Sequence, residues 1–422
     1  MTEAREVVTL SNGARIVFDP MPHLRTAAVG VFLGAGARHE PADRNGLAHF
    51  LEHMAFKGAK GLNARELAEA IEARGASINA ATDYERTSYF VRCLSDDAPA
   101  MLDIALSMVF APDHPPEEVE REKGVILQEI GEAADQPEDL VFELAQQASF
   151  PDHPLGRPIL GTEQTLATVT RDDLLRFASQ NYGGRHTVVS VAGAFDREAI
   201  LAIVHRWLDL RAGDPAMRYW PPGLAANSIR TEARKLEQCH LVFGRSTVGA
   251  VSEDRFAARV FAEIFGGGMA SRLFQDIRES RGLAYTIDAS CDQYSDAGRI
   301  SVYAGCDPKD ALEVTRLTSA IWADMAAKGP TDVELARAKA IMAAQFAMAA
   351  EAPAMRAGSA AYELLTFDRL VGVDEALKHI DAVTLADVRR IAQDCLAGPA
   401  IAAAVGPKAG LGAAEAFVSA RP

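Results

Sequence analysis

The sequence predicts an α+β fold of two similar domains, each with a mostly antiparallel sheet and helices packed on one side of it. Three observations lead to this prediction. Stretches that alternate apolar and polar residues, as strands do, stand beside stretches with apolar residues every three or four positions, as helices do. The chain has 422 residues, more than a single hydrophobic core usually organises. A motif that opens a long helix at Pro116 also recurs at Pro330.

The first domain is expected to begin with strands and continue with helices. Residues 7–18 alternate around Asn12-Gly13, which is the strongest short signal for a β-hairpin. Residues 26–34 are more continuously apolar and predict a further strand, and residues 76–94 alternate again and predict one long hairpin. Helices are expected from their apolar spacing at 47–56, 64–74 and 99–110.

A proline- and glycine-rich segment ending at Gly223 is the best candidate for a linker. It divides the chain into a first domain of residues 1–212, a linker of residues 213–223 and a second domain of residues 224–422. Pro116-Glu-Glu-Val-Glu120 in the first domain recurs as Pro330-Thr-Asp-Val-Glu334 in the second. We therefore expect the two domains to descend from an internal duplication.

Composition narrows the classes of function. The net charge of −15 argues against nucleic acid as a partner, because such a partner requires a basic surface. The apolar runs are shorter than a bilayer span, and the chain does not begin with a basic region followed by an apolar one, so no membrane partner is expected. The five cysteines form no CxxC pair, which predicts reduced thiols and a cytoplasmic location.

The sequence His49-Phe-Leu-Glu-His53 carries the most specific chemistry. On a helix, His49 and His53 project from one face, one turn apart, so that both imidazoles can reach one metal ion. Glu52 projects beside that face, where it can accept a proton from a water on the metal. This is an H-x-x-E-H arrangement, the reverse of the commoner H-E-x-x-H. Core histidines whose hydrogen bonds are satisfied are the alternative.

The expected second repeat lacks this cluster. The aligned positions hold small or apolar residues: His49, Glu52 and His53 correspond to Ala262, Phe265 and Gly266. Polar residues needed only for structure would have no reason to be lost together, whereas members of one site would. The comparison of the two halves therefore favours a functional site in the first.

A catalytic zinc takes three protein ligands, so a third ligand should follow. Residues 117–132 form a strongly predicted helix with an acidic first turn, as a helix start should have. Glu122 and Glu129 lie seven residues apart, on nearly the same face. Apolar neighbours of Glu129, such as Ile126 and Ile130, predict that it points inward, where a carboxylate requires a cation.

With these residues the chain resembles the pitrilysin-type inverted zincins, and within them the mitochondrial-processing-peptidase branch. The resemblance covers almost the whole chain, and several separate motifs occur in the right order. They are Gly46–Gly58, Asn79-Ala-Ala-Thr82 with Glu85-Arg-Thr87, Arg121–Glu129, Pro154–Gly161 and Gly266–Phe274.

The resemblance implies one zinc ion per chain. It assigns His49, His53 and Glu129 to the zinc, Glu52 to the general base and Glu122 to a supporting position behind a ligand. Asn79 and Ala80 match the edge strand to which family members add a substrate peptide, although an asparagine at a hairpin turn is the alternative.

The resemblance also implies functional residues in the second domain. Arg278 and Tyr285 match a family pair that holds the substrate carbonyl and stabilises the oxyanion, with a surface arginine and a packed tyrosine as the alternative. Family architecture implies two chains that face each other, so that this pair approaches the zinc of the other chain. Because this chain carries both parts, we expect a homodimer.

The expected activity is that of a zinc metalloendopeptidase acting on unfolded peptides, oligopeptides or presequences in a closed chamber. The competing expectation is a noncatalytic scaffold subunit or a peptide-binding partner of a larger complex. Glu143 matches a family position that reads basic residues, and Asp139 lies four residues before it. This pair predicts a preference for substrates with Arg or Lys, unless it forms a solvated helix face.

Overall fold

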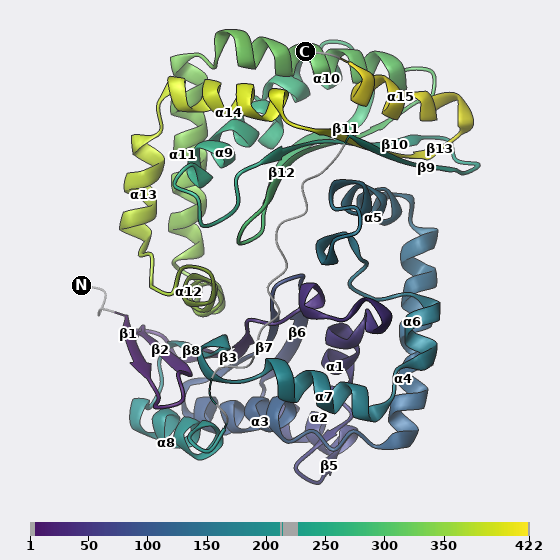
Figure 1. The fold of residues 1–422 in the computed structure, drawn as a ribbon. Coiled ribbons are helices and arrows are strands. Elements are labelled where there is room, and N and C mark those ends of the chain that lie inside the picture. Colours follow the sequence, from purple (N-terminus) through teal and green to yellow (C-terminus); the bar gives the residue numbers. More distant parts are fainter. Residues whose placement is uncertain (1–4, 212, 214–226, 421–422) are drawn as a thin grey trace. The chain divides into compact units, whose positions relative to one another are not determined.

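The computed structural model describes residues 5–211, 213 and 227–420, which form two compact units (Figure 1). The first unit contains Met1–Ile130, Arg157–Tyr219 and Ala347–Val371, and the second contains Gly131–Gly156, Trp220–Phe346 and Gly372–Pro422. Each unit therefore includes one segment from the opposite half of the chain. The expected linker at 213–223 lies, apart from Gly213, outside the described residues, so the division at that point stays a prediction.

The first unit is built on a six-stranded sheet. Its order is β1-β2-β8-β3-β7-β6, and all neighbours are antiparallel except β2 and β8. The strands are β1 (Glu6–Thr9), β2 (Arg15–Pro20), β3 (Thr26–Leu33), β6 (Ser77–Thr82), β7 (Thr87–Leu94) and β8 (Thr187–Gly193), with a separate pair of β4 (Gly58–Ala59) and β5 (Leu62–Asn63). The two expected hairpins and the expected strand between them are thus present.

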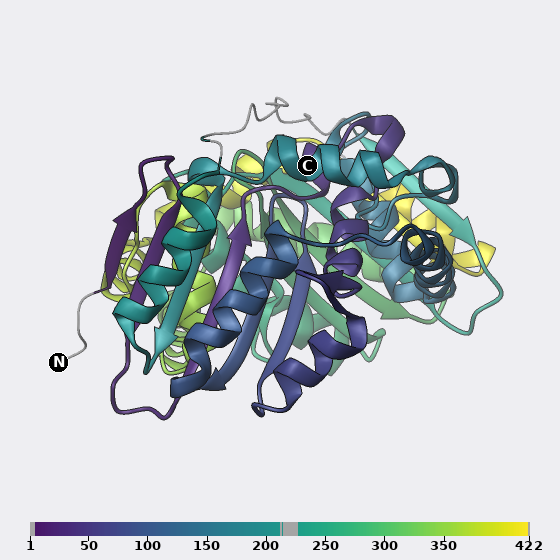
Figure 2. The same ribbon diagram turned by 90° about the horizontal axis from the view of Figure 1, so that it is seen from below.

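Helices cover one face of this sheet. Figure 2 shows α8 and α3 side by side across it, with α2 farther along the same face. The helices of the unit are α1 (Leu47–Ala55), α2 (Ala64–Glu72), α3 (Ala98–Phe110), α4 (Pro116–Asp135), α6 (Glu163–Thr168), α7 (Arg171–Asn181), α8 (Arg197–Leu208) and α12 (Pro353–Phe367), with α4 ending in the second unit. Alternate strand residues such as Val29 and Val31 pack against Leu102 and Leu106 of α3, which removes both layers from water.

The opposite face of the sheet is covered by α12, from the second half of the chain. Its residues Ala360 and Leu364 pack on Val17 and Val188, which point away from the α3 side because side chains alternate along a strand. Arg356 of α12 donates through Nε to Asp19 at 2.8 Å, and Asp19 is fully buried. The sequence predicted helices on one side only, and this distant helix adds a partial third layer.

The second unit has a five-stranded sheet of order β11-β12-β10-β13-β9, antiparallel except for β13 and β9. Its strands are β9 (Ser228–Ala233), β10 (Cys239–Thr247), β11 (Ala284–Gln293), β12 (Gly298–Cys306) and β13 (Ala400–Gly406). Its helices are α5 (Pro137–Ser149), α9 (Arg255–Ala262), α10 (Ala311–Lys328), α11 (Asp332–Ala349), α13 (Val373–Ala382), α14 (Leu385–Ala397) and α15 (Lys408–Ser419), with π-helical turns at Glu263–Gly267 and Phe274–Glu279. The core on one face is built around the fully buried Trp322 and Phe417.

The two sheets share one topology. Strands β2, β8, β3, β7 and β6 correspond in order and direction to β9, β13, β10, β12 and β11. In the second unit, α5 from the first half packs Val141 and Ala145 on Val242 and Ala403, as α12 does in the first unit. The α+β class with two similar, mostly antiparallel sheets is confirmed. In the described part of the chain, no helix combines the length and apolar character that crossing a bilayer requires.

Candidate metal centre

Helix α1 presents an apolar side and a polar side. Phe50, Leu51 and Met54 are buried and pack against α4 and α7, so hydrophobic burial fixes which way the helix is turned. His49 and His53 stand on the other side, one turn apart, with ring centroids 4.6 Å from each other. The amphipathic pattern of nine residues therefore aims both imidazoles at the same space.

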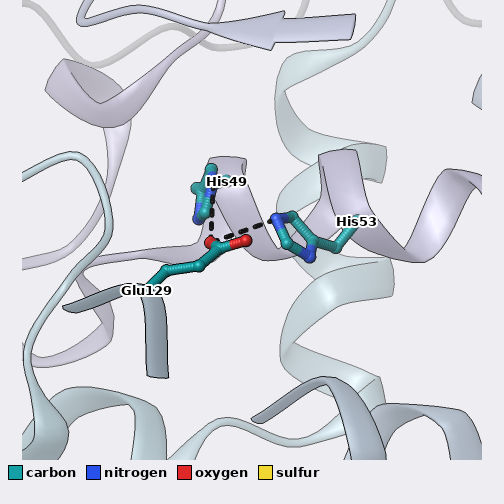
Figure 3. A group of neighbouring side chains, drawn as sticks. All are labelled: His49, His53 and Glu129. Atoms are coloured by element: carbon teal, nitrogen blue, oxygen red, sulfur yellow. Dashed lines mark ion pairs between the residues drawn. The ribbon is translucent and has the colours of Figure 1, made fainter. Parts of the chain in front are cut away.

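Glu129 of α4 completes a cluster with the two histidines (Figure 3). Its Oε2 lies 3.8 Å from Nε2 of His49 and 3.4 Å from Nε2 of His53. One donor atom from each residue lies within 4.8 Å of the others. The Glu129 side chain is 36% exposed, against 14% and 18% for His49 and His53, so the cluster is open on the carboxylate side.

The donor set fits a divalent ion that takes nitrogen and oxygen ligands. The pKa of His49 is lowered to about 4, mainly by burial and to a smaller extent by the neighbouring His53. His49 is therefore neutral near pH 7 and offers a lone pair, as a metal ligand must. Two neutral imidazoles and one carboxylate can bind a doubly charged cation and leave it one net positive charge.

Glu122 orients His53 through the ring nitrogen that faces away from the cluster. His53 Nδ1 lies 3.0 Å from Glu122 Oε2, and a proton on Nδ1 leaves the lone pair of Nε2 facing the cluster. Glu122 is only 2% exposed, and its other oxygen pairs with Lys57 Nζ at 2.6 Å. The sequence placed Glu122 in this supporting position but did not identify Lys57 as its partner.

Glu52 lies on the same helix, beside the cluster but outside the group of three donors. Thr82 of β6 donates a hydrogen bond from Oγ1 to Glu52 Oε2 at 2.6 Å, which fixes the carboxylate. Burial raises the pKa of Glu52, and this hydrogen bond opposes the increase. A half-buried carboxylate that is held in place and has a raised pKa suits proton transfer.

Strand β6 is an edge strand, because among the described strands it pairs with β7 alone. Asn79 Oδ1 accepts a hydrogen bond from Ala80 N at 2.9 Å, so the side chain satisfies a backbone donor on this strand. Since Thr82 of the same strand contacts Glu52, a peptide paired with β6 would run next to the cluster. This geometry is suited to the addition of an extended peptide as a further strand.

Comparisons with known proteins identify the family of this chain. The family model for insulinase-type peptidases of family M16 matches residues 15–163, and the model for the M16 inactive domain matches residues 168–342. An uncharacterized zinc protease of Mycobacterium tuberculosis is 34% identical over 404 residues, which are 94% of this chain and 92% of that protein. This chain belongs to peptidase family M16.

Solved structures share the fold of this M16 chain. A protease from Helicobacter pylori has a TM-score of 0.88 at 21% identity, and the match covers 96% of this chain and 100% of the other. A chain of complex III from Candida albicans has a TM-score of 0.81 at 21% identity, with 95% of both chains covered. These identities show the common fold alone. The processing-peptidase branch expected from the sequence stays a prediction.

The second unit of this M16 chain carries the remaining expected residues. Arg278 lies in the π-helical turn Phe274–Glu279, with its guanidinium 4.7 Å from the ring centre of Phe274, and Tyr285 lies on β11, 68% exposed. The metal cluster belongs to the first unit, so the role expected for this pair stays a prediction. Tyr285 is not the packed tyrosine of the alternative interpretation.

Glu143 and Asp139 lie on α5, as expected. Asp139 is exposed, whereas Glu143 is half-buried and accepts a hydrogen bond from Gln147 Nε2 at 3.2 Å. Burial raises the pKa of Glu143. The pair is therefore not a uniformly solvated helix face, and selection of basic side chains by Glu143 stays a prediction.

Sequence reasoning missed several residues that support the site. Thr82 and Lys57 stood inside quoted motifs, but only the fold shows that they contact Glu52 and Glu122. Glu40 was not singled out, yet it is fully buried against the start of α1. An acidic residue in a polar loop is usually solvated, so the sequence carried no signal for it.

Proposed function

We propose that this M16 chain is a zinc metalloendopeptidase that hydrolyses unfolded peptides, oligopeptides or presequences in a closed chamber. The observation that carries the proposal is the convergence of His49, His53 and Glu129, with Glu52 held beside them. The zinc proteases among its relatives support zinc as the ion, one per chain.

A zinc ion in this site supplies a Lewis acid that polarises the substrate carbonyl and lowers the pKa of a water molecule. His49, His53 and Glu129 hold the ion, and Glu122 keeps His53 in the tautomer that can bind it. Glu52 accepts the proton of the attacking water and passes it to the leaving amine. Thr82 positions Glu52 for both transfers.

The substrate binds as an extended strand along Asn79 and Ala80 of β6. The Ala80 N–H, satisfied by the Asn79 side chain in this structure, is then released to a peptide carbonyl. Arg278 and Tyr285 hold the substrate carbonyl and stabilise its developing negative charge. They reach the site from the second chain of a homodimer.

Substitution of Glu52 tests the activity. E52Q should lower kcat on a quenched fluorescent peptide by about 10²–10⁴-fold, because an amide cannot accept the proton. Bound zinc, measured by elemental analysis, should stay close to one per chain, since Glu52 is not a ligand. E69Q, on the exposed surface of α2, is the control and should cleave as the wild type does.

Two outcomes would contradict the proposal. Wild-type protein that holds zinc but cleaves none of a set of peptides would favour a noncatalytic scaffold subunit or a peptide-binding partner. If the wild-type protein holds no metal and the H49A substitution changes nothing, the metal site itself is refuted.

We also propose that Glu143 selects basic substrates, since it is half-buried and acidic. E143Q should reduce cleavage of peptides with Arg or Lys near the scissile bond and leave neutral peptides unaffected. Equal relative rates on both kinds of peptide would refute this selectivity.

A further inference from the structure

Glu40 is a fully buried carboxylate at the start of the metal-binding helix. Its Oε1 accepts a hydrogen bond from Ala48 N at 2.7 Å, and its Oε2 accepts from Gly46 N at 2.7 Å. The side chain of Asn45 donates to the same Oε2, also at 2.7 Å. Three short bonds from N–H groups are an unusually complete set of partners for one buried carboxylate.

These bonds replace a cap that α1 lacks. The residue at the N-cap position is Gly46, which has a φ of 102° and no side chain to accept from the first turn. Glu40, six residues earlier, supplies the acceptor instead. Burial raises the pKa of Glu40 to about 7, and the charged form of its carboxyl lies at the positive end of the helix dipole, where it is favourable.

The loop that carries Glu40 is itself held from two directions. Arg157 donates from Nη1 to the Glu40 carbonyl at 2.9 Å, and Asn45 Nδ2 donates to the Pro158 carbonyl at 3.0 Å. On the other side, Arg38 pairs with Glu85 at 2.7 Å. Two motifs that the proposed mechanism does not use, Pro154–Gly161 and Glu85-Arg-Thr87, thus hold the start of α1.

The loop before α1 and the segment Pro154–Gly161 pack so closely that there is no room for side chains between them. A Cβ on Gly46 would lie 2.8 Å from the carbonyl oxygen of Leu160, and a Cβ on Gly161 would lie 2.5 Å from the carbonyl oxygen of Asn45. Gly46 and Gly161 also have positive φ values. The backbone before α1 is therefore fixed in position by close packing as well as by hydrogen bonds.

The two histidines differ in how they are held. His53 is oriented through Nδ1 by Glu122, whereas Nδ1 of His49 is buried and has no hydrogen-bond partner in the described part of the chain. The direction of the His49 ring therefore depends on the backbone of the first turn of α1. That turn contains Ala48, the residue that Glu40 holds.

We propose that Glu40 is a positioning residue for the metal centre, which fixes His49 through the first turn of α1 as Glu122 fixes His53 directly. This inference rests on the proposed function, because it takes His49 to be a zinc ligand. Its consequence is that loss of the Glu40 carboxylate weakens zinc binding without removing any ligand.

The test is the zinc affinity of E40Q, measured by competition with a chromophoric chelator on the full chain. An amide has one acceptor oxygen, so E40Q turns an NH2 group toward at least one of the three N–H donors. The dissociation constant for zinc should rise by about 10-fold or more, within the range typical of residues that support a ligand. E40D keeps the charge on a shorter side chain and should restore part of the affinity.

E363Q is the matched control, since Glu363 is also a buried carboxylate of the first unit. Glu363 lies on α12, away from the metal centre, where it accepts from Ser359 Oγ at 3.1 Å and from Val371 N at 2.7 Å and pairs with Arg5 at 3.2 Å. E363Q should lower the unfolding temperature of the metal-free protein as E40Q does, yet leave the zinc affinity at the wild-type value.

Folded E40Q with a zinc affinity within about twofold of the wild type would overturn the inference and show a purely structural role for Glu40. If E40Q does not fold, the zinc affinity of N45A is measured instead. This variant removes the Asn45 side chain that donates to Glu40 and leaves the Glu40 carboxylate in place. Unchanged zinc affinity in N45A would likewise overturn the inference, and weakened affinity would support it. Absence of zinc binding in the wild type would instead refute the proposed function, on which the inference rests.

Discussion

At His53 the two ring nitrogens have different tasks. Nε2 faces Glu129 and the position of the metal, and Nδ1 faces the buried carboxylate of Glu122. A hydrogen bond to a carboxylate increases the basicity of the opposite nitrogen, which strengthens it as a ligand. Lys57 balances the charge of Glu122, so this pair costs less to bury than an isolated carboxylate.

A prediction at this scale concerns Glu122. E122Q should raise the zinc dissociation constant by about 10–100-fold, because a neutral amide polarises and orients His53 less strongly. Chelator competition measures the change. E120Q, on the exposed surface of the same helix, is the control and should bind zinc as the wild type does. Equal affinities in E122Q and E120Q would contradict the role given to Glu122.

The residues of the cluster could be predicted from the sequence because their spacing repeats that of a helix. His49 and His53 lie one turn apart, and Glu129 could be proposed from its apolar neighbours. Two further apolar neighbours of Glu129, Val125 and Leu127, are 39% and 37% exposed, so this stretch of the helix is less buried than its apolar residues predict. Glu129 faces the histidines, but its own side chain is only half-buried.

At the scale of single elements, α11 begins with a capping box. Thr331 donates from N and Oγ1 to Glu334 Oε2, and Glu334 N donates to Thr331 Oγ1. Arg272 forms a bidentate ion pair with Glu334, in which Nε donates to Oε1 at 2.7 Å and Nη2 donates to Oε2 at 2.8 Å. The recurring motif that indicated a duplication is therefore also a helix start.

This helix start predicts a pH-dependent contribution to stability. The Arg272 hydrogen bond, opposed by partial burial, lowers the pKa of Glu334 to about 2. Because the folded-state pKa lies below the usual 4.5, the contribution is complete above about pH 4.5 and is lost as the pH falls toward 2.

E334Q should thus lower the free energy of unfolding by about 1–2 kcal/mol at pH 7, since water screens this partly exposed pair. Urea unfolding followed by circular dichroism measures the difference, which should shrink as the pH is lowered from 5 to 3. E313Q, in a fully exposed pair with Arg316, should leave the unfolding midpoint unchanged. A difference for E334Q that stays constant with pH would contradict the ionic explanation.

At the scale of the whole molecule, the two halves of the chain exchange a helix. Helix α5 follows α4 in the first half but packs in the second unit, and α12 does the reverse. The two expected domains therefore share chain segments, and neither compact unit is continuous in sequence. Separate expression of 1–212 would leave Val17 and Val188 without the helix that covers them.

The proposed homodimer predicts that two inactive variants can restore each other. E52Q lacks the base and Y285F lacks the oxyanion donor, so a mixed dimer contains one site with both groups intact. After dissociation and random reassociation of an equal mixture, about a quarter of the wild-type activity should return. Fluorescent-peptide cleavage measures it. If no activity returns although mixed dimers form, the two residues do not act across an interface between chains.

The sequence by itself predicted the class of fold, two similar domains and the cluster of His49, His53 and Glu129. These follow from periodicity along the chain, because the period of a helix or strand decides which neighbours share a face. Tertiary structure alone decided the roles of Thr82, Lys57 and Glu40, and the exchange of α5 and α12. Such contacts join residues far apart in the chain or in irregular loops, where spacing carries no information about which side chains meet.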